Sequence, residues 1–206
     1  KNLDAMKGGY LGPSFDNKEI ESQLISSGAN FFKLNDKDLI KYVANALSKG
    51  KAVGWMQGRM EFGPRALGAR SILADPRSKK MQKQLNLKIK YRESFRPFAP
   101  SILIEDVSDW FEHYEESPYM LYVADIKKDK RLDISEKDKE LFGIEKINVI
   151  RSCVPAITHV DYSARIQTVH KETNSIYHSL ISKFNEITGC PIVVNTSFNV
   201  RGEPIV

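Results

Sequence analysis

Six of the chain's ten arginines lie between residues 59 and 96, and half of these stand in one glycine-rich stretch, residues 57–71. That stretch presents Arg59, Arg65 and Arg70 directly after a short apolar run. Glycines let backbone N–H groups approach an anion closely, and a guanidinium is a permanently charged, forked donor. The pattern predicts an anion-binding loop, with a surface arginine cluster that makes salt bridges as the alternative. It has neither the Walker A nor the dinucleotide-binding spacing of glycines.

A second basic cluster, Lys90, Arg92 and Arg96, lies in a proline-containing loop between a predicted helix and a predicted strand. General basic surfaces use lysine at least as freely as arginine, so arginines gathered in such loops favour recognition of phosphate or carboxylate groups. The alternative is that Arg92 and Arg96 pair with Glu93 or Glu61.

Polar side chains of several kinds surround a third segment, residues 158–168. His159 can serve there as a general acid or base, or as a donor to a phosphoryl oxygen; a structural histidine is the alternative. Alternation along a strand predicts that Arg165 and Gln167, with Ser163, share one face.

A fourth polar segment follows a buried apolar run near the end of the sequence. It contains Asn195, Ser197, Asn199 and Arg201. Amide and hydroxyl side chains can hold phosphates and sugar hydroxyls, and Arg201 adds a cation. A polar turn that satisfies its own backbone is the alternative.

The elements that position these segments are predicted from periodicity and capping signals. The charge-dense stretch 127–146 predicts a solvated connection, with a lid-like loop as the alternative. Because helices and strands alternate irregularly, we expect an α/β fold of the α+β type with a mixed sheet and flanking helices. Helices are expected at 35–50, 78–89, 106–111 and 174–189, and strands at 51–56, 99–104, 119–126, 166–169 and 191–194.

The composition restricts the class of protein. A chain of 206 residues with 41% hydrophobic content can bury a sizeable core, and its net charge of +5 favours anionic ligands. The two cysteines have no disulfide or zinc spacing, and we find neither an apolar run long enough for a membrane span nor a signal peptide, so we expect the cytoplasm. We expect residues 1–34 to be a linker or lead-in from a missing N-terminal half. Residues 35–206 should form the domain, truncated at its C-terminus.

Four ordered motifs resemble the C-terminal region of the NodU/CmcH carbamoyltransferase family: GRMEFGPRALGARSILADPR, YRESFRPFAPSIL, HVDYSARIQTV and NTSFNVRGEPIV. The opening GGYLGPS also resembles the junction between the two halves of that family. The resemblance implies a YrdC/Sua5-like fold, a twisted mixed sheet with a basic concave cavity. Lys90-x-Arg92 and Ser197-x-Asn199 resemble the nucleotide-binding pairs of that fold, although the proline that follows Lys-x-Arg there follows Arg96 here.

The resemblance further implies an ATP-dependent O-carbamoyltransferase. This half would take carbamoyl phosphate and ATP with Mg²⁺ and form carbamoyl-adenylate and pyrophosphate. A Kae1-like N-terminal half, which carries the metal site of the family, would transfer the carbamoyl group to an acceptor hydroxyl. No metal site is expected in the present chain, and a homodimer is left open.

The resemblance also implies roles for individual residues. Four are expected to be catalytic: Arg65, Arg96, His159 and Arg165. Eight are expected to bind ATP or carbamoyl phosphate: Arg59, Arg70, Lys90, Arg92, Asn195, Ser197, Asn199 and Arg201. Three rival functions stay open at this stage, namely an RNA-binding YrdC-like module, a threonylcarbamoyl-adenylate synthase, and a nucleotide-binding domain that is inactive without its partner half. We do not expect nucleic acid to bind, because the aromatic residues near the arginines lie in Pro/Gly loops.

Overall fold

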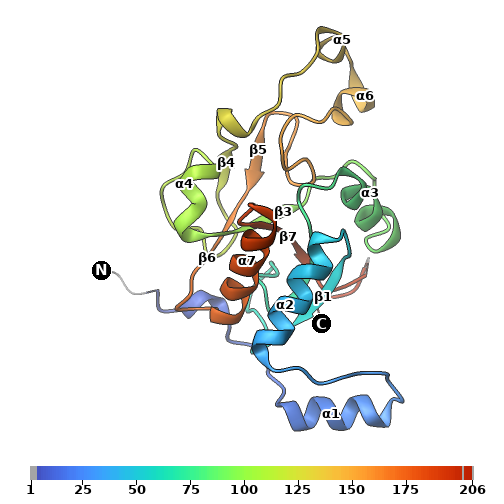
Figure 1. Cartoon of the computed structure of the whole chain (residues 1–206), viewed down its shortest axis with the longest axis vertical. Helices are drawn as coiled ribbons and strands as arrows, with labels where there is room; N and C mark the ends of the chain where they lie inside the picture. The colour runs from blue at the N-terminus through green and yellow to red at the C-terminus, as the bar shows by residue number, and fades with distance from the viewer. Residues whose placement is uncertain (1–3, 201, 206) are drawn as a thin grey trace.

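The computed structural model describes residues 4–200 and 202–205, and at its centre is a five-stranded mixed sheet (Figure 1). The strand order is β1-β2-β7-β3-β6. Only the β3–β6 pair is parallel among the pairs of this sheet, which confirms the predicted mixed α/β fold. The likeness to the YrdC/Sua5 fold stays a prediction. The strands are β1 (Val53–Met56), β2 (Arg70–Ala74), β7 (Ile192–Ser197), β3 (Ala99–Leu103) and β6 (Gln167–Val169).

Strand β2 was not predicted. It is buried along its whole length and forms a hairpin with β1, so the arginine-rich stretch is the loop of that hairpin. The strand β7 is also longer than predicted, since it continues through Ser197 instead of ending at Val194. Its polar end therefore lies within the sheet, between the first residues of β2 and β3.

Two helices, α2 (Asp36–Ser48) and α7 (Ser175–Thr188), pack side by side against the sheet (Figure 1). Both begin at a predicted cap, because the side chains of Asn35 and Asn174 accept hydrogen bonds from backbone N–H groups of the first turn. Gly189 ends α7 in the left-handed conformation, as predicted. Ile187 was expected in the apolar stripe of α7 but is 41% exposed.

A third helix, α3 (Lys79–Lys88), carries the chain from β2 toward the second basic cluster. Its predicted cap is confirmed, because the side chain of Ser78 accepts from the N–H group of Met81. Met81 and Leu85 are buried on its inner face.

A second, two-stranded sheet pairs β4 (Val123–Asp125) with β5 (Ser163–Arg165). β4 is shorter than the predicted strand at 119–126, and β5 and β6 belong to different sheets. The short helix α4 (Val107–Trp110) follows the 3-10 turn η2 (Ile104–Asp106).

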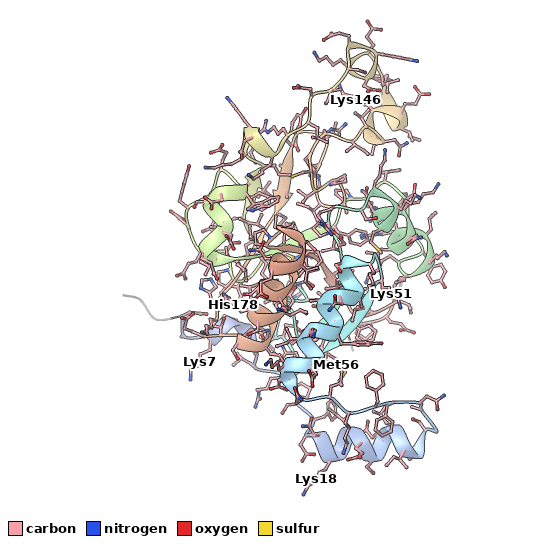
Figure 2. All side chains as sticks on the ribbon, in the orientation of Figure 1. Lys7, Lys18, Lys51, Met56, Lys146 and His178 are labelled. Atoms are coloured by element: carbon pink, nitrogen blue, oxygen red, sulfur yellow. The ribbon has the colours of Figure 1, made fainter. Side chains whose placement is uncertain are left out.

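Residues 127–150, which include the charged stretch 127–146, form a projection that we call the excursion. It contains η3 (Lys128–Lys130), α5 (Glu136–Lys139) and α6 (Gly143–Ile147), and α5 and α6 stand at one end of the molecule (Figure 1). Helix α1 (Asn17–Ser26) lies at the opposite end and buries none of its residues. Lys146 on the excursion and Lys18 on α1 both lie at these extremities (Figure 2).

The lead-in before α1 packs along the arginine-rich loop. After η1 (Lys7–Gly9), backbone hydrogen bonds join Gly9, Gly12 and Pro13 to Met60 and Phe62 at 2.7 to 2.9 Å. Among the described residues, no helix is long and apolar enough to cross a membrane.

Candidate functional site

Three adjoining cavities lie where β7 ends and where β2 and β3 begin, and we call them together the basic groove. Their volumes are about 280, 190 and 400 Å³. They are one region because Arg92 and Ser197 line the first and second cavities, and Arg165 lines the second and third. Nine of the predicted site residues line the groove: Arg65, Lys90, Arg92, Arg96, His159, Arg165, Asn195, Ser197 and Asn199.

Lys90 brings two of the sequence motifs together. Its ammonium lies 2.5 Å from the carbonyl oxygen of Ser197 and 3.1 Å from its hydroxyl oxygen, and 3.1 and 2.8 Å from the carbonyl and side-chain oxygens of Asn199. These oxygens carry partial charges only, so the positive charge has no ionic partner in this set. Burial, with a smaller effect of Arg92, lowers the pKa of Lys90 to about 8.

Arg92 and Arg96 are held differently. The Nε atom of Arg92 donates to the side-chain oxygen of Asn86 at 2.6 Å, and its guanidinium lies 4.8 Å from the centre of the Phe98 ring. Burial and the neighbouring Arg96 lower the pKa of Arg92. Arg96 pairs with Glu93 at 3.0 Å in an exposed position, where an ion pair is weak and readily exchanged.

Arg65 and Arg165 lie far apart in the sequence, and both line the middle cavity of the groove. Arg165 is the last residue of β5. Its Nε atom is buried without a hydrogen-bond partner among the described residues. Burial and the charge of Arg65 lower the pKa of Arg165. A buried guanidinium donor without an acceptor is costly, so an anion in the groove would stabilise this arrangement.

His159 lies at the rim of the groove on a tight turn. The backbone N–H group of His159 donates to the carbonyl oxygen of Ser163 at 2.9 Å. The side chain of Asp161 accepts from the backbone N–H and the hydroxyl groups of Ser163 at 3.0 and 2.7 Å. Desolvation lowers the pKa of His159, an effect that Asp161 opposes and Arg165 reinforces. The ring is therefore neutral at neutral pH and can accept or donate one hydrogen bond.

Asn195 and Gln167 form a buried polar cluster behind the groove. The amide nitrogen of Asn195 donates to Ala66 O, Ser101 Oγ and Gln167 Oε1 at 2.9 to 3.0 Å. Gln167 does not share the groove face with Arg165, because the chain passes from one sheet to the other between them. The predicted common face of these two residues was wrong for this reason.

Two predicted binding residues, Arg70 and Arg59, do not line the groove, and a third lies outside the described part of the chain. The guanidinium of Arg70 is buried and donates to the carbonyl oxygens of Gln57, Gly58 and Ala69 at 2.9 to 3.2 Å, so it is placed to hold the loop instead of a phosphate. Arg59 is exposed and donates to the carbonyl oxygen of Leu11 at 3.1 Å. Arg201 lies outside the described residues.

Glu61 was not predicted as a functional residue, yet it organises the arginine-rich loop. It is buried, and its Oε1 atom accepts from the N–H groups of Leu67 and Ala69 at 2.7 Å and of Arg70 at 3.2 Å. The negative charge of a carboxylate strengthens these three hydrogen bonds. The signal in the sequence is a single acidic residue among the glycines and arginines of the loop. The loop carries Arg65 at its tip.

The carbonyl groups of the same loop are fixed as well. Gly68 O accepts from the side chains of Trp55 and Gln57 at 3.0 and 2.9 Å. Leu67 O accepts from Tyr10 at 2.7 Å and from Gln167 at 2.8 Å. We call residues 66–70 the clamped segment, because side chains bind most of its polar backbone groups. Such fixation orients Arg65 before any ligand arrives.

Among the described residues, no group of three His, Cys, Asp or Glu side chains could hold a metal ion. Glu93 is the one carboxylate among the described residues that line the groove. Cys153 and Cys190 are both free thiols.

Comparison with known proteins places these features in a family. A family model described as carbamoyltransferase C-terminus matches residues 44–206. Protein sll1178 of Synechocystis is 60% identical over 205 residues, which are 98% of this chain and 33% of that protein. The nodulation protein NolNO of Sinorhizobium fredii is 40% identical over 201 residues, 96% of this chain and 27% of its own length. The 3'-hydroxymethylcephem-O-carbamoyltransferase of Amycolatopsis lactamdurans is 38% identical over 164 residues, 80% of this chain and 27% of its own.

The chain thus spans a third or less of the length of these relatives, between 27% and 33%. The matches confirm the resemblance to NodU/CmcH-type proteins that the four motifs carried. With those motifs meeting at one groove and the family model covering the sequence from residue 44 onward, the chain belongs to the carbamoyltransferase family and corresponds to its C-terminal region.

Proposed function

We propose that the chain is the nucleotide-using region of an ATP-dependent O-carbamoyltransferase, and that the basic groove binds carbamoyl phosphate and ATP. One observation carries the proposal. Five cationic side chains line the groove, and Glu93 is the one carboxylate among its described lining residues. The five are Arg65, Lys90, Arg92, Arg96 and Arg165. Such an excess of positive charge favours ligands that bear several phosphate charges.

The proposed reaction has two stages. Hydrolysis of carbamoyl phosphate gives carbamate and inorganic phosphate, and a carbamate oxygen then attacks the α-phosphorus of ATP. The bond from the α-phosphorus to the bridging oxygen breaks, which gives carbamoyl-adenylate and pyrophosphate. The acceptor hydroxyl next attacks the carbamoyl carbon and AMP leaves. The groove contributes by holding the two anions close together and by stabilising the charge that builds up on phosphoryl oxygens.

Each groove residue has a proposed role in that chemistry. Lys90, Arg92, Ser197 and Asn199 hold the phosphates of ATP, and Asn195 supports them from behind. Arg65 and Arg96 bind the phosphate of carbamoyl phosphate, and Arg165 neutralises charge between the two ligands. His159, neutral at the rim, donates to or accepts from a phosphoryl oxygen. A Mg²⁺ ion that accompanies ATP would be held mainly by phosphate oxygens, since the groove offers it one carboxylate.

The remaining stage lies outside this chain in the proposal. A Kae1-like N-terminal region of the same protein would bind the acceptor and transfer the carbamoyl group, which agrees with relatives of which the chain covers 33% and 27%. A cytoplasmic location is proposed because both thiols are free. The cephem relative is named an O-carbamoyltransferase, and we extend only that reaction type to this chain.

A pyrophosphate-release assay tests the proposal directly. ATP and Mg²⁺ are incubated with the chain, with and without carbamoyl phosphate. We expect release that depends on carbamoyl phosphate and falls about 100-fold or more in Arg65→Ala, because a charged group next to the transition state is lost. Lys80→Ala, a change of an exposed lysine outside the groove, should leave the rate unchanged.

Two results would contradict the proposal. Release of pyrophosphate that depends on threonine would identify a threonylcarbamoyl-adenylate synthase. Unchanged ATP affinity in both Arg65→Ala and Lys90→Met, measured by calorimetry, would remove the groove from nucleotide binding. A chain that binds ATP through these residues but never releases pyrophosphate would be a binding domain that depends on its N-terminal region.

A further inference from the structure

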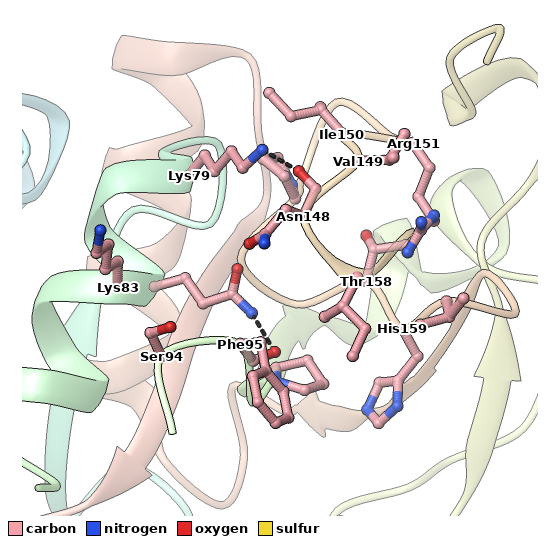
Figure 3. A pocket seen from close by; sticks show the side chains of 15 residues that line it. Lys79, Lys83, Ser94, Phe95, Asn148, Val149, Ile150, Arg151, Thr158 and His159 are labelled. Atoms are coloured by element: carbon pink, nitrogen blue, oxygen red, sulfur yellow. Dashed lines mark hydrogen bonds between the residues drawn. The ribbon is translucent and has the colours of Figure 1, made fainter. Parts of the chain in front are cut away.

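A separate cavity of about 150 Å³ lies between helix α3 and the end of the excursion, and we call it the side pocket (Figure 3). Lys79 and Lys83, four residues apart on α3, line one side. Arg151 and the backbone around Asn148 line the other. The pocket adjoins the basic groove at His159 and Pro97, which line both.

The ionisable groups of the side pocket are all basic. Lys79, Lys83, Arg151 and His159 line it, and no aspartate or glutamate is among its described lining residues. A surface that merely stays soluble mixes both signs of charge, so a concave site with three permanent cations and no anion favours an anionic ligand.

Arg151 supplies an independent indication. It is only 4% exposed, and while one of its terminal nitrogens donates to the carbonyl oxygen of Lys146 at 2.6 Å, its Nε atom is buried without a partner among the described residues. No ion pair of Arg151 is found among the described residues, although Asp133 and Asp138 line a neighbouring cavity with it. A buried guanidinium donor without an acceptor is destabilising unless something outside the chain compensates it. An oxyanion offers both the charge and the acceptor.

The walls of the pocket are fixed before any ligand arrives. The ammonium of Lys79 donates to the carbonyl oxygen of Asn148, which ties α3 to the excursion, and Gln82 donates to Phe95 O at 3.0 Å (Figure 3). The hydroxyl of Thr158 lies 2.6 Å from that of Ser152 and donates to Val154 O at 2.8 Å. Fixed walls lower the entropy cost of binding.

We propose that the side pocket binds a phosphate-class oxyanion at a site distinct from the groove. Lys83 and Arg151 are its principal contacts, and Lys79 contributes charge while it holds the wall. Two sources share this chemistry, a free phosphate ion and the phosphate chain of a nucleotide whose remainder lies in the groove. The proposal concerns binding alone, and it stands whether or not the chain forms carbamoyl-adenylate.

Chemical acetylation of lysines, read by mass spectrometry, tests the proposal at the residue. Lys83 lines the pocket, whereas Lys80 is exposed on the same helix and lies outside its lining, so the two form an internal comparison. At constant ionic strength, saturating inorganic phosphate should slow acetylation of Lys83 by about fivefold or more relative to Lys80, since a bound anion occupies the amine. Protection by phosphate identifies the free ion, and protection by ATP alone identifies the nucleotide chain.

Variants separate the side pocket from the groove. Arg151→Gln should abolish the protection of Lys83 by inorganic phosphate, whereas Arg65→Ala, which weakens the groove, should leave that protection intact. Protection by ATP should weaken in both variants, because a nucleotide that reaches the side pocket is also held in the groove. Because Arg151 is buried, its variant is first checked for folding by circular dichroism, and Lys79→Gln, an exposed change, gives a second test. Lys83 acetylated as fast as Lys80 with every anion would overturn the proposal. So would protection, by either anion, that is retained in both Arg151→Gln and Lys79→Gln.

Discussion

The ammonium of Lys90 has a pKa of about 8, so it titrates within the range in which the chain can be studied. A phosphate in the groove stabilises the charged form and raises that pKa, and ligand binding is then coupled to proton uptake. We expect ATP affinity to be greatest below pH 8 and to fall above it, by at most about tenfold per pH unit. Calorimetric titration of ATP between about pH 6.5 and about pH 9.5 measures this dependence.

The variant Lys90→Met is the matched comparison. It lacks the titrating group, so its weaker ATP affinity should be nearly independent of pH across the same range. A wild-type affinity that does not change through pH 8 would refute the assignment of Lys90 to the phosphates.

The same group gives a prediction for stability. Its pKa in the folded chain lies below its ordinary value of 10.5, so between about pH 8 and 10.5 the unfolded state binds more protons. The contribution of Lys90 to the free energy of unfolding therefore rises with pH in that window. The difference in stability between wild type and Lys90→Met, from urea unfolding at several pH values, should shift in favour of wild type as the pH increases. A constant difference would contradict the lowered pKa.

At this scale the sequence identified residue types better than residue roles. Arginines in glycine- and proline-containing loops predicted an anion site, and Arg65 and Arg92 do line one cavity. That the cavity binds an anion stays a prediction. Arg70 belongs to the same pattern, yet its side chain is turned inward onto carbonyl oxygens. The spacing of the arginines does not tell which of them faces inward. Arg70 does so because it is the first residue of β2, a strand that the sequence pattern did not predict.

At the scale of elements, the clamped segment is the least expected feature. Glu61 binds three of its amides, and Gly68 has a φ of +100° with the Tyr177 ring against it. A Cβ at Gly68 would lie 2.2 Å from a ring carbon, so no side chain fits there. The loop is thus built around an inward carboxylate and a glycine, both of which serve to present Arg65.

We expect Glu61→Gln to make the loop, and with it the position of Arg65, less fixed. A glutamine can keep its carbonyl oxygen toward the three N–H groups, but it lacks the negative charge that strengthens these hydrogen bonds. Its NH2 group would also lie where the buried Oε2 atom of Glu61 has no partner among the described residues, so the fold should lose about 2 to 4 kcal/mol. If the loop positions Arg65, the catalytic constant should fall while the pH profile keeps the wild-type shape. The exposed Glu19→Gln in α1 is a control for the chemical change. If Glu61→Gln lost the expected stability but kept the wild-type catalytic constant and Michaelis constant, the loop would not position Arg65.

The helices were predictable where local chemistry decides them. Asn35, Ser78 and Asn174 cap their helices because each has a side-chain acceptor placed for the first free N–H groups. The strands were less predictable than the helices. The break between β5 and β6, and the extension of β7 through polar residues, follow from pairing with partners far away in the sequence.

At the scale of the whole molecule, the groove depends on segments that the sequence does not place together. The hairpin loop, the end of α3, the end of β7 and the turn before β5 meet because β7 lies at the centre of the sheet, between β2 and β3. The motifs were predictable one by one, and a shared cavity was implied by the family resemblance. The strand order that brings them together was not, because non-local pairing leaves no mark in a single sequence.

The lead-in is part of this convergence. Tyr10, far from the groove in the sequence, donates through its hydroxyl to Leu67 O at 2.7 Å and accepts from Asn174 at 3.0 Å. The backbone of the lead-in also pairs with Met60 and Phe62. Residues 7–13 therefore lie against the arginine-rich loop and link it to the start of α7.

Tyr10→Phe tests that link. Loss of the hydroxyl leaves the Asn174 donor and part of Leu67 O unsatisfied, so the free energy of unfolding should fall by about 1 to 2 kcal/mol. Because Leu67 belongs to the clamped segment, ATP affinity should weaken as well, and by less than in Arg65→Ala. Tyr42→Phe is the matched control, since Tyr42 is exposed on α2 and its ring contacts Phe32 edge to face. Equal stability and ATP affinity in the two variants would mean that the lead-in packs beside the loop without supporting it.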